Sequence, residues 1–145
     1  MCSIIGFTSK KLTAQSVRAY FDRTVSRGPD ATRVLELDGP DDQRVVEGPF
    51  GLMGFGRLAI MGLHEEGMQP FHLGGDMAVC NGELYGFRQL RKELSAKYSF
   101  KSESDCEIIL PLYREYGLEM FKKLDAEFAM IIYDGQTKQL IAARD

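Results

Sequence analysis

Met1-Cys2-Ser3-Ile4-Ile5-Gly6-Phe7 opens the chain, with a cysteine at position 2 followed by a short apolar run. The run predicts a buried strand over residues 3–7, directly after the cysteine. Initiator methionine is usually removed when the second residue is small, and its loss would leave Cys2 with a thiol and a free α-amine. Because an α-amine has a pKa of about 8, its neutral fraction can accept the thiol proton. Cys2 is therefore a candidate nucleophile with its own base, although a cysteine at position 2 is also compatible with chance.

A helix and several strands are expected beyond this start. Thr13 is a good helix N-cap, and an apolar stripe with helical spacing follows it at Val17, Tyr20, Phe21 and Val25. Further patterns predict strands at 33–37 and 77–80 and one or two strands within 50–60, with a polar turn at 39–43 and a loop at 61–73. They also predict helices through 87–94 and from 104 onward, and a hairpin of strands 127–133 and 139–143. This order indicates an α+β fold in which helices pack on antiparallel sheets.

Local signals set the expected ends of these elements. Asn81-Gly82 should close the strand before it, because an Asn-Gly pair is usually a turn. Ser104 with Glu107 three residues later has the spacing of a capping box at a helix start, and Gly117 should end that helix. Pro111 lies inside the same helix, where it should remove a backbone hydrogen bond and introduce a kink.

The composition limits the class of function. A chain of 145 residues, 44% hydrophobic and 27% charged, is typical of one globular domain with a real core. The formal net charge is -3, and no clustered basic excess indicates a nucleic-acid partner. No apolar run reaches the roughly 18 residues of a membrane span, and the start lacks the pattern of a signal peptide. We therefore expect a cytoplasmic protein with no nucleic-acid or membrane partner.

The cysteines and histidines are few and widely spaced. Cys2, Cys80 and Cys106 form no CxxC pair, and His64 and His72 complete no metal-ligand spacing, so no metal site is expected. Cys80 and Cys106 are more typical of buried core thiols than of nucleophiles. Neither histidine is assigned a role. Free thiols agree with a reducing compartment.

Asn81-Gly82 has a chemical interpretation besides a turn. The Asn81 side-chain amide and the Gly82 N–H can both point at a developing oxyanion, and glycine permits close approach. Taken alone, the pair is more typical of a turn.

Three charged residues match the two charged groups of an α-amino acid. Arg57, in an apolar strand, can bind a carboxylate with two parallel hydrogen bonds, or it can be a surface-facing strand residue. Glu83 and Asp105 can accept hydrogen bonds from an ammonium group. Each is also compatible with a first-turn helix carboxylate that interacts with the helix dipole.

Five motifs carry a resemblance to a known family. They are Met1-Cys2-Ser3-Ile4-Ile5-Gly6, Arg27-Gly28-Pro29-Asp30, Gly56-Arg57-Leu58-Ala59-Ile60, Asn81-Gly82-Glu83-Leu84-Tyr85 and Ser104-Asp105-Cys106-Glu107-Ile108-Ile109. They resemble the class II glutamine amidotransferases, and their order and spacing are similar to the N-terminal domain of glutamine-dependent asparagine synthetases. The resemblance covers nearly the whole chain, residues 1–145. It implies a four-layer αββα N-terminal-nucleophile hydrolase sandwich.

The resemblance also implies a role for each candidate residue. Cys2 would attack the glutamine side-chain amide and form a γ-glutamyl thioester, with Asn81 and the Gly82 N–H as the oxyanion hole. Arg57 would bind the substrate carboxylate. Glu83 and Asp105 would bind its α-ammonium group. Residues 27–30 would border the site.

The same resemblance sets expectations about cofactors and partners. The glutaminase domain needs none, whereas ATP and Mg²⁺ belong to a synthetase domain that family members carry beyond Asp145 and that is absent here. We therefore expect a C-terminally truncated domain whose ammonia serves that synthetase domain in the full-length chain. An inactive regulatory module, a different nitrogen acceptor and a homo-oligomer stay open. Ser26, Gly86 and Pro111 depart from the family pattern outside the candidate catalytic set.

Overall fold

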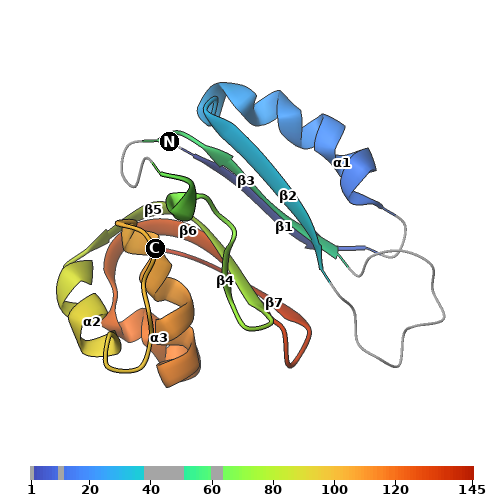
Figure 1. The fold of residues 1–145 in the computed structure, drawn as a ribbon. Helices are drawn as coiled ribbons and strands as arrows, with labels where there is room; N and C mark the ends of the chain where they lie inside the picture. Colours follow the sequence, from blue (N-terminus) through green and yellow to red (C-terminus); the bar gives the residue numbers. More distant parts are fainter. Residues whose placement is uncertain (1, 10–11, 38–50, 60–63) are drawn as a thin grey trace.

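Two antiparallel sheets packed face to face form the centre of the molecule (Figure 1). The computed structural model describes residues 2–9, 12–37, 51–59 and 64–145, so the expected turn at 39–43 lies outside the described residues. The first sheet has the strand order β1-β3-β2, and the second has the order β4-β5-β6-β7. Their bounds are β1 Ser3–Thr8, β2 Ala31–Leu37, β3 Gly51–Arg57, β4 Phe71–Leu73, β5 Asp76–Tyr85, β6 Asp125–Asp134 and β7 Gln139–Arg144.

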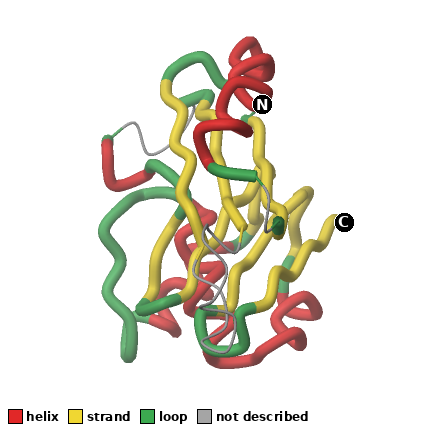
Figure 2. Tube along the Cα trace, turned by 90° about the vertical axis from the view of Figure 1, so that its right-hand side faces the viewer, coloured by secondary structure: helices red, strands yellow, loops and turns green. Residues whose placement is uncertain are grey.

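Helices cover the outer faces of both sheets. Helix α1 (Ala14–Phe21) lies on the first sheet, and α2 (Phe87–Leu94) and α3 (Ile109–Tyr116) lie on the second (Figure 1). Short 3-10 helices connect them: η1 Asp22–Arg27, η3 Glu65–Gly67, η4 Asp105–Ile108 and η5 Gly117–Lys123. The expected α+β sandwich with αββα layers is therefore confirmed. Strand β7 is an edge strand and leads to the C-terminus at the side of the molecule (Figure 2). No helix in the described ranges is long and apolar enough to cross a membrane.

Two hydrophobic clusters separate the layers. The inter-sheet cluster consists of Leu37, Met53, Phe55, Met68, Val79 and Tyr133. The second cluster joins β5 and β6 to α2 and α3 and includes Cys80, Leu84, Phe87, Ile109, Leu112 and Ile132. Each such side chain contributes about 1.5–3 kcal/mol on burial, so together they hold the strand ends that carry the candidate site.

The start of α1 follows the sequence prediction, and its end does not. Thr13 Oγ1 accepts a hydrogen bond from the Ser16 N–H at 3.2 Å, and Ser16 Oγ accepts one from the Thr13 N–H at 3.0 Å. Val17 and Phe21 are buried as predicted, but Tyr20 and Val25 are 65% and 52% exposed. The predicted stripe is wrong at Val25 because the chain has passed from α1 into the 3-10 helix η1, where the repeat changes. Tyr20 lies within α1 and is exposed, with the Arg23 guanidinium 5.2 Å from its ring centroid.

Asn81-Gly82 does not end its strand. Strand β5 continues to Tyr85, with Asn81 opposite Ala129 and Gly82 opposite Phe128 on β6. A Cβ atom on Gly82 would lie 2.3 Å from the Glu127 carbonyl oxygen, so this position requires glycine for close approach. The turn prediction is wrong because the ladder with β6 outweighs the local preference of an Asn-Gly pair.

The segment before α3 also differs from the prediction. Ser104 is the N-cap of η4 but makes no side-chain capping bond. Glu107 instead accepts hydrogen bonds from the Lys101 and Ser102 N–H groups at 2.7 and 2.8 Å, so the predicted capping box is wrong. Pro111 lies in the first turn of α3, where backbone N–H groups have no acceptor within the helix, and it does not interrupt the helix. Gly117 ends α3 with a φ of 54°, as predicted.

Candidate active site

Cys2 lies directly before β1 and is tied to the end of β3. Its Sγ accepts a hydrogen bond from the Leu58 N–H at 3.4 Å and donates one to the Leu58 carbonyl at 3.6 Å. The antiparallel register that pairs Ser3 with Gly56 brings the start of β1 and the end of β3 together. The thiol is half-buried. The sequence therefore places the candidate nucleophile at a fixed position beside the last residue of β3.

Arg57 is that last residue of β3, and it is buried. Its side chain is 7% exposed, and Nη1 donates a hydrogen bond to the His64 carbonyl at 3.1 Å. The alternative of a surface-facing strand residue is wrong because the side chain is buried and bound to the His64 carbonyl. A buried guanidinium on the residue before Leu58, which Cys2 contacts, favours the binding of an anionic group.

The loop from Arg27 to Asp30 packs against the same strand end. The Asp30 N–H donates to the Arg57 carbonyl at 3.0 Å, and Asp30 Oδ2 accepts from the Ala59 N–H at 2.7 Å. A Cβ on Gly28 would lie 2.2 Å from the Gly56 carbonyl oxygen. This loop therefore holds the β3 end that contacts Cys2.

Strand β5 brings its candidate residues to the inter-sheet face. Met77 packs against the inter-sheet cluster and Val79 belongs to it. Because side chains alternate along a strand, Asn81 and Glu83 extend from the same face. Asn81 is half-buried, and Gly82 and Glu83 are exposed. Glu83 is a strand residue, so its alternative as a first-turn helix carboxylate is wrong.

Cys2 and strand β5 border the same inter-sheet cluster. Cys2 packs against the same inter-sheet cluster as Met77. Figure 1 shows the start of β1 on the side of the molecule where β5 runs toward α2. Strands β1 and β5, about 80 positions apart in the sequence, thus contact each other across the sandwich.

Asp105 lies on the outer side of β5. It is the first residue of η4, is 8% exposed, and accepts a hydrogen bond from the Leu84 N–H through Oδ2 at 2.7 Å. Its position at a helix start agrees with the structural alternative. A carboxylate accepts several hydrogen bonds, so this bond is also compatible with a ligand ammonium.

The end of β5 has an anionic environment. Glu83 lies directly opposite Glu127 on β6, and Tyr85 lies opposite Asp125. The carboxylate of Glu127 raises the pKa of Tyr85, and burial, Glu83 and Asp125 raise it further. Paired like charges are unfavourable in a sheet, so this end favours a cationic group.

Cys80 and Cys106 are buried free thiols, as predicted. The pKa of Cys106 is raised well above its usual value by a hydrogen bond with Cys80 and by burial. A protonated, buried thiol is a poor nucleophile. Of the cysteines, Cys2 is the one that the described structure leaves partly accessible.

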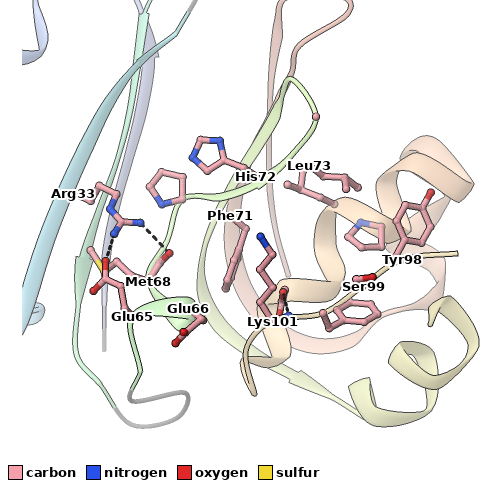
Figure 3. Close-up of a pocket in the computed structure, with 16 residues that line it drawn as sticks. Arg33, Glu65, Glu66, Met68, Phe71, His72, Leu73, Tyr98, Ser99 and Lys101 are labelled. Atoms are coloured by element: carbon pink, nitrogen blue, oxygen red, sulfur yellow. Dashed lines mark hydrogen bonds and ion pairs between the residues drawn. The ribbon is translucent and has the colours of Figure 1, made fainter. Parts of the chain in front are cut away.

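A separate pocket lies away from these residues. It has a volume of about 450 Å³ between η3, β4 and the segment 98–101 (Figure 3). Arg33 bridges one wall through an ion pair with Glu65 at 2.5 Å and a hydrogen bond to the Met68 carbonyl at 3.3 Å. None of the predicted site residues lines this pocket.

The sequence prediction assigned no role to Gln69, which the structure places beside the site. It lies in the predicted loop 61–73, is 5% exposed, and is hydrogen-bonded to both backbone groups of Cys80. The sequence signal for Gln69 is a polar residue before Pro70, and this pattern does not distinguish an exposed loop residue from a buried residue that binds a strand.

The family model described as "Glutamine amidotransferase domain" matches residues 1–145. The chain belongs to this family. Curated relatives of the amidotransferase domain include a probable glutamine-hydrolysing asparagine synthetase of Acanthamoeba polyphaga mimivirus, 38% identical over 100% of this chain and 26% of that protein. Asparagine synthetase B of Escherichia coli is 31% identical over 100% of this chain and 25% of that protein. The predicted resemblance is thus confirmed.

Other relatives of this amidotransferase domain carry a different name. Amidase chry2 of Gibberella zeae is 39% identical over 93% of the chain and 19% of that protein. A solved structure of glutamine phosphoribosylpyrophosphate amidotransferase from Bacillus subtilis shares the fold, with a TM-score of 0.71, 18% identity, and coverage of 99% of this chain and 36% of that one. The domain spans about a fifth to a quarter of the length of these curated relatives.

Proposed function

We propose that this domain hydrolyses glutamine to glutamate and ammonia, with Cys2 as nucleophile once Met1 is removed. The Cys2 thiol gives its proton to the α-amine, and the sulfur attacks the side-chain carbonyl carbon. The C–N bond then breaks, the amine returns the proton to the departing ammonia, and water hydrolyses the thioester to glutamate. The observation that carries the proposal is the contact of Sγ with both backbone groups of Leu58, beside buried Arg57.

Asn81 and Gly82 supply the oxyanion hole in this proposal. The Asn81 side chain is on the inter-sheet face that Cys2 borders. The Leu84 N–H points away from β6 to Asp105, and alternation along the strand directs the Gly82 N–H to the same edge. Two donors of this kind each stabilise a tetrahedral oxyanion by roughly 3 kcal/mol.

The charges of the site match a free α-amino acid. Arg57 binds the substrate carboxylate, and Glu83 and Asp105 bind the α-ammonium group. The burial of Arg57 and the anionic end of β5 support this orientation. A substrate without its α-ammonium would leave these carboxylates uncompensated, so glutamine is favoured over a simple amide.

The ammonia serves a nitrogen acceptor elsewhere in a larger protein. From the names of its relatives, we infer a domain of the asparagine-synthetase type as the recipient. Its dependence on ATP and Mg²⁺ and its cytoplasmic location are part of this proposal, from the family resemblance of the five motifs. The amidase relatives favour a second candidate, an amidotransferase for a different acceptor. Comparison of aspartate with other carboxylic acids as acceptors in the full-length protein distinguishes the two.

Intact mass spectrometry before and after treatment with 6-diazo-5-oxo-norleucine tests the hydrolase. We expect loss of Met1, one adduct located on Cys2, and glutamate release from untreated protein. Cys2→Ser is the control and should lose both the adduct and the release. A retained Met1 with an unlabelled Cys2 and no glutamate release would refute the proposal and favour an inactive module.

A further inference from the structure

Gln69 is a buried amide in the segment that leads into β4. Its Nε2 donates a hydrogen bond to the Cys80 carbonyl at 3.1 Å, and its Oε1 accepts one from the Cys80 N–H at 2.6 Å. The side chain is 5% exposed. Both polar atoms of the amide are thus committed to one residue of β5, the residue before Asn81.

The Gln69 side chain binds backbone groups of β5 that a neighbouring strand would otherwise pair. Strand β4 pairs with β5 from Phe71 opposite Ala78 to Leu73 opposite Asp76. The same register would place Gln69 opposite Cys80, but β4 begins only at Phe71, and Cys80 is bound by the side chain of Gln69. The carboxamide of Gln69 presents one donor and one acceptor, as a peptide group does, and completes the pairing with its side chain.

Alternation along β5 relates this contact to the oxyanion hole. The backbone groups of Cys80 face the β4 side, where Gln69 binds them, and the Leu84 N–H faces the same side, where Asp105 accepts it. Gly82 lies midway between them, so its N–H is directed to this edge as well. The edge is therefore held on both sides of Gly82 by side chains.

We propose that Gln69 is a positioning residue that fixes the Cys80–Gly82 backbone and thereby aims the Asn81 amide and the Gly82 N–H. This inference rests on the proposed glutaminase function. Cys80 bonds to Gln69 through its carbonyl, which belongs to the peptide group joined to Asn81. Without that bond the peptide can rotate, and a misplacement of about 1 Å in a catalytic donor lowers turnover about 100-fold.

Gln69→Leu tests the proposal through two rates measured on the same protein. We expect kcat for glutamine to fall about 10- to 100-fold with KM changed less than about threefold, because the oxyanion forms only in the transition state. Alkylation of Cys2 by iodoacetamide needs no oxyanion hole, so its rate should stay within about twofold of the parent rate.

Asp76→Asn is the matched control at the other end of β5. Asp76 is also buried, and it accepts hydrogen bonds from the Gly135 N–H at 2.9 Å and from Arg114. Its replacement should lower stability while kcat of the folded enzyme is retained. If Gln69→Leu lowers kcat and alkylation in equal proportion, its role is structural and the proposal is overturned.

Gln69→Glu keeps the proposal testable if the leucine variant does not fold. A neutral carboxylic acid can donate to the Cys80 carbonyl and accept from its N–H, whereas a carboxylate cannot donate. We expect kcat relative to the parent enzyme to be higher at acidic pH and to fall as the introduced group ionises. A constant ratio across pH would contradict the proposal. Absence of turnover in the parent protein would instead refute the glutaminase function itself.

Discussion

The two halves of β5 are built differently. At Met77 and Ala78 the strand has a backbone ladder on both sides, from β4 and β6. From Cys80 onward β6 continues on one side, whereas on the other side single side chains, Gln69 and Asp105, hold the backbone. A complete ladder uses every backbone donor. Where side chains bind only some of the backbone groups along an edge, the remaining N–H groups can bind a ligand. The first half of β5 is therefore structural, and the second half is suited to chemistry.

Asn81→Ala, in the second half of β5, should produce the largest effect on turnover. Loss of one oxyanion donor should lower the glutaminase kcat by roughly two to three orders of magnitude, with thermal unfolding little changed because Asn81 is only half-buried. Steady-state ammonia release and calorimetry check both parts. Unchanged turnover would show that Asn81 is only a strand residue.

Gly82→Ala and Gly75→Ala compare the second half of β5 with the turn that leads into its first half, each by a single methyl group. At Gly82 the new Cβ would meet the Glu127 carbonyl at 2.3 Å, so we expect a loss of about 1–3 kcal/mol in the free energy of unfolding. At Gly75 the nearest atom is 3.7 Å away, an ordinary contact, so the change should be small. Urea unfolding of the two variants measures the difference, and equal destabilisation would contradict it.

Asp76→Asn should weaken the first half without changing the chemistry. Asp76 is 2% exposed, but its partner Arg114 is one-third exposed, so water compensates part of the loss. We expect the free energy of unfolding to fall by about 2 kcal/mol, below the cost of breaking a fully buried pair. A lower kcat per folded molecule would show that the two halves are coupled.

Tyr113→Phe should give the smallest effect, a modest loss of stability below pH 10 that disappears as the pH rises toward 12. Burial, and then a hydrogen bond to Asp134 at 2.8 Å, raise the pKa of Tyr113 from 10.0 to about 12. A raised pKa means that the contribution of Tyr113 to stability is present below pH 10 and is lost as the pH rises toward 12. The stability of the parent protein should therefore fall more steeply than that of the variant over this range. Parallel curves in alkaline urea titrations would refute this assignment.

Local signals identified most elements but not how far each extends. Thr13 caps α1, Gly117 ends α3, and the terminal hairpin forms where the alternating pattern predicts it. The Asn81-Gly82 turn and the Ser104 capping box failed because each competed with a longer-range partner, β6 in one case and the 101–102 backbone in the other. Short-range preferences are worth about 1 kcal/mol, and a strand ladder exceeds them.

The sequence by itself determined the family, the α+β sandwich fold and the types of residue that the chemistry needs, because motif order and apolar periodicity depend only on the order of residues in the chain. Tertiary structure alone decided that Arg57 is buried, that Glu83 faces Glu127, and that Gln69 takes the place of a strand beside Cys80. These facts depend on which segments become neighbours. Gln69 and Cys80 are eleven residues apart, and only the register of β4 on β5 makes them partners.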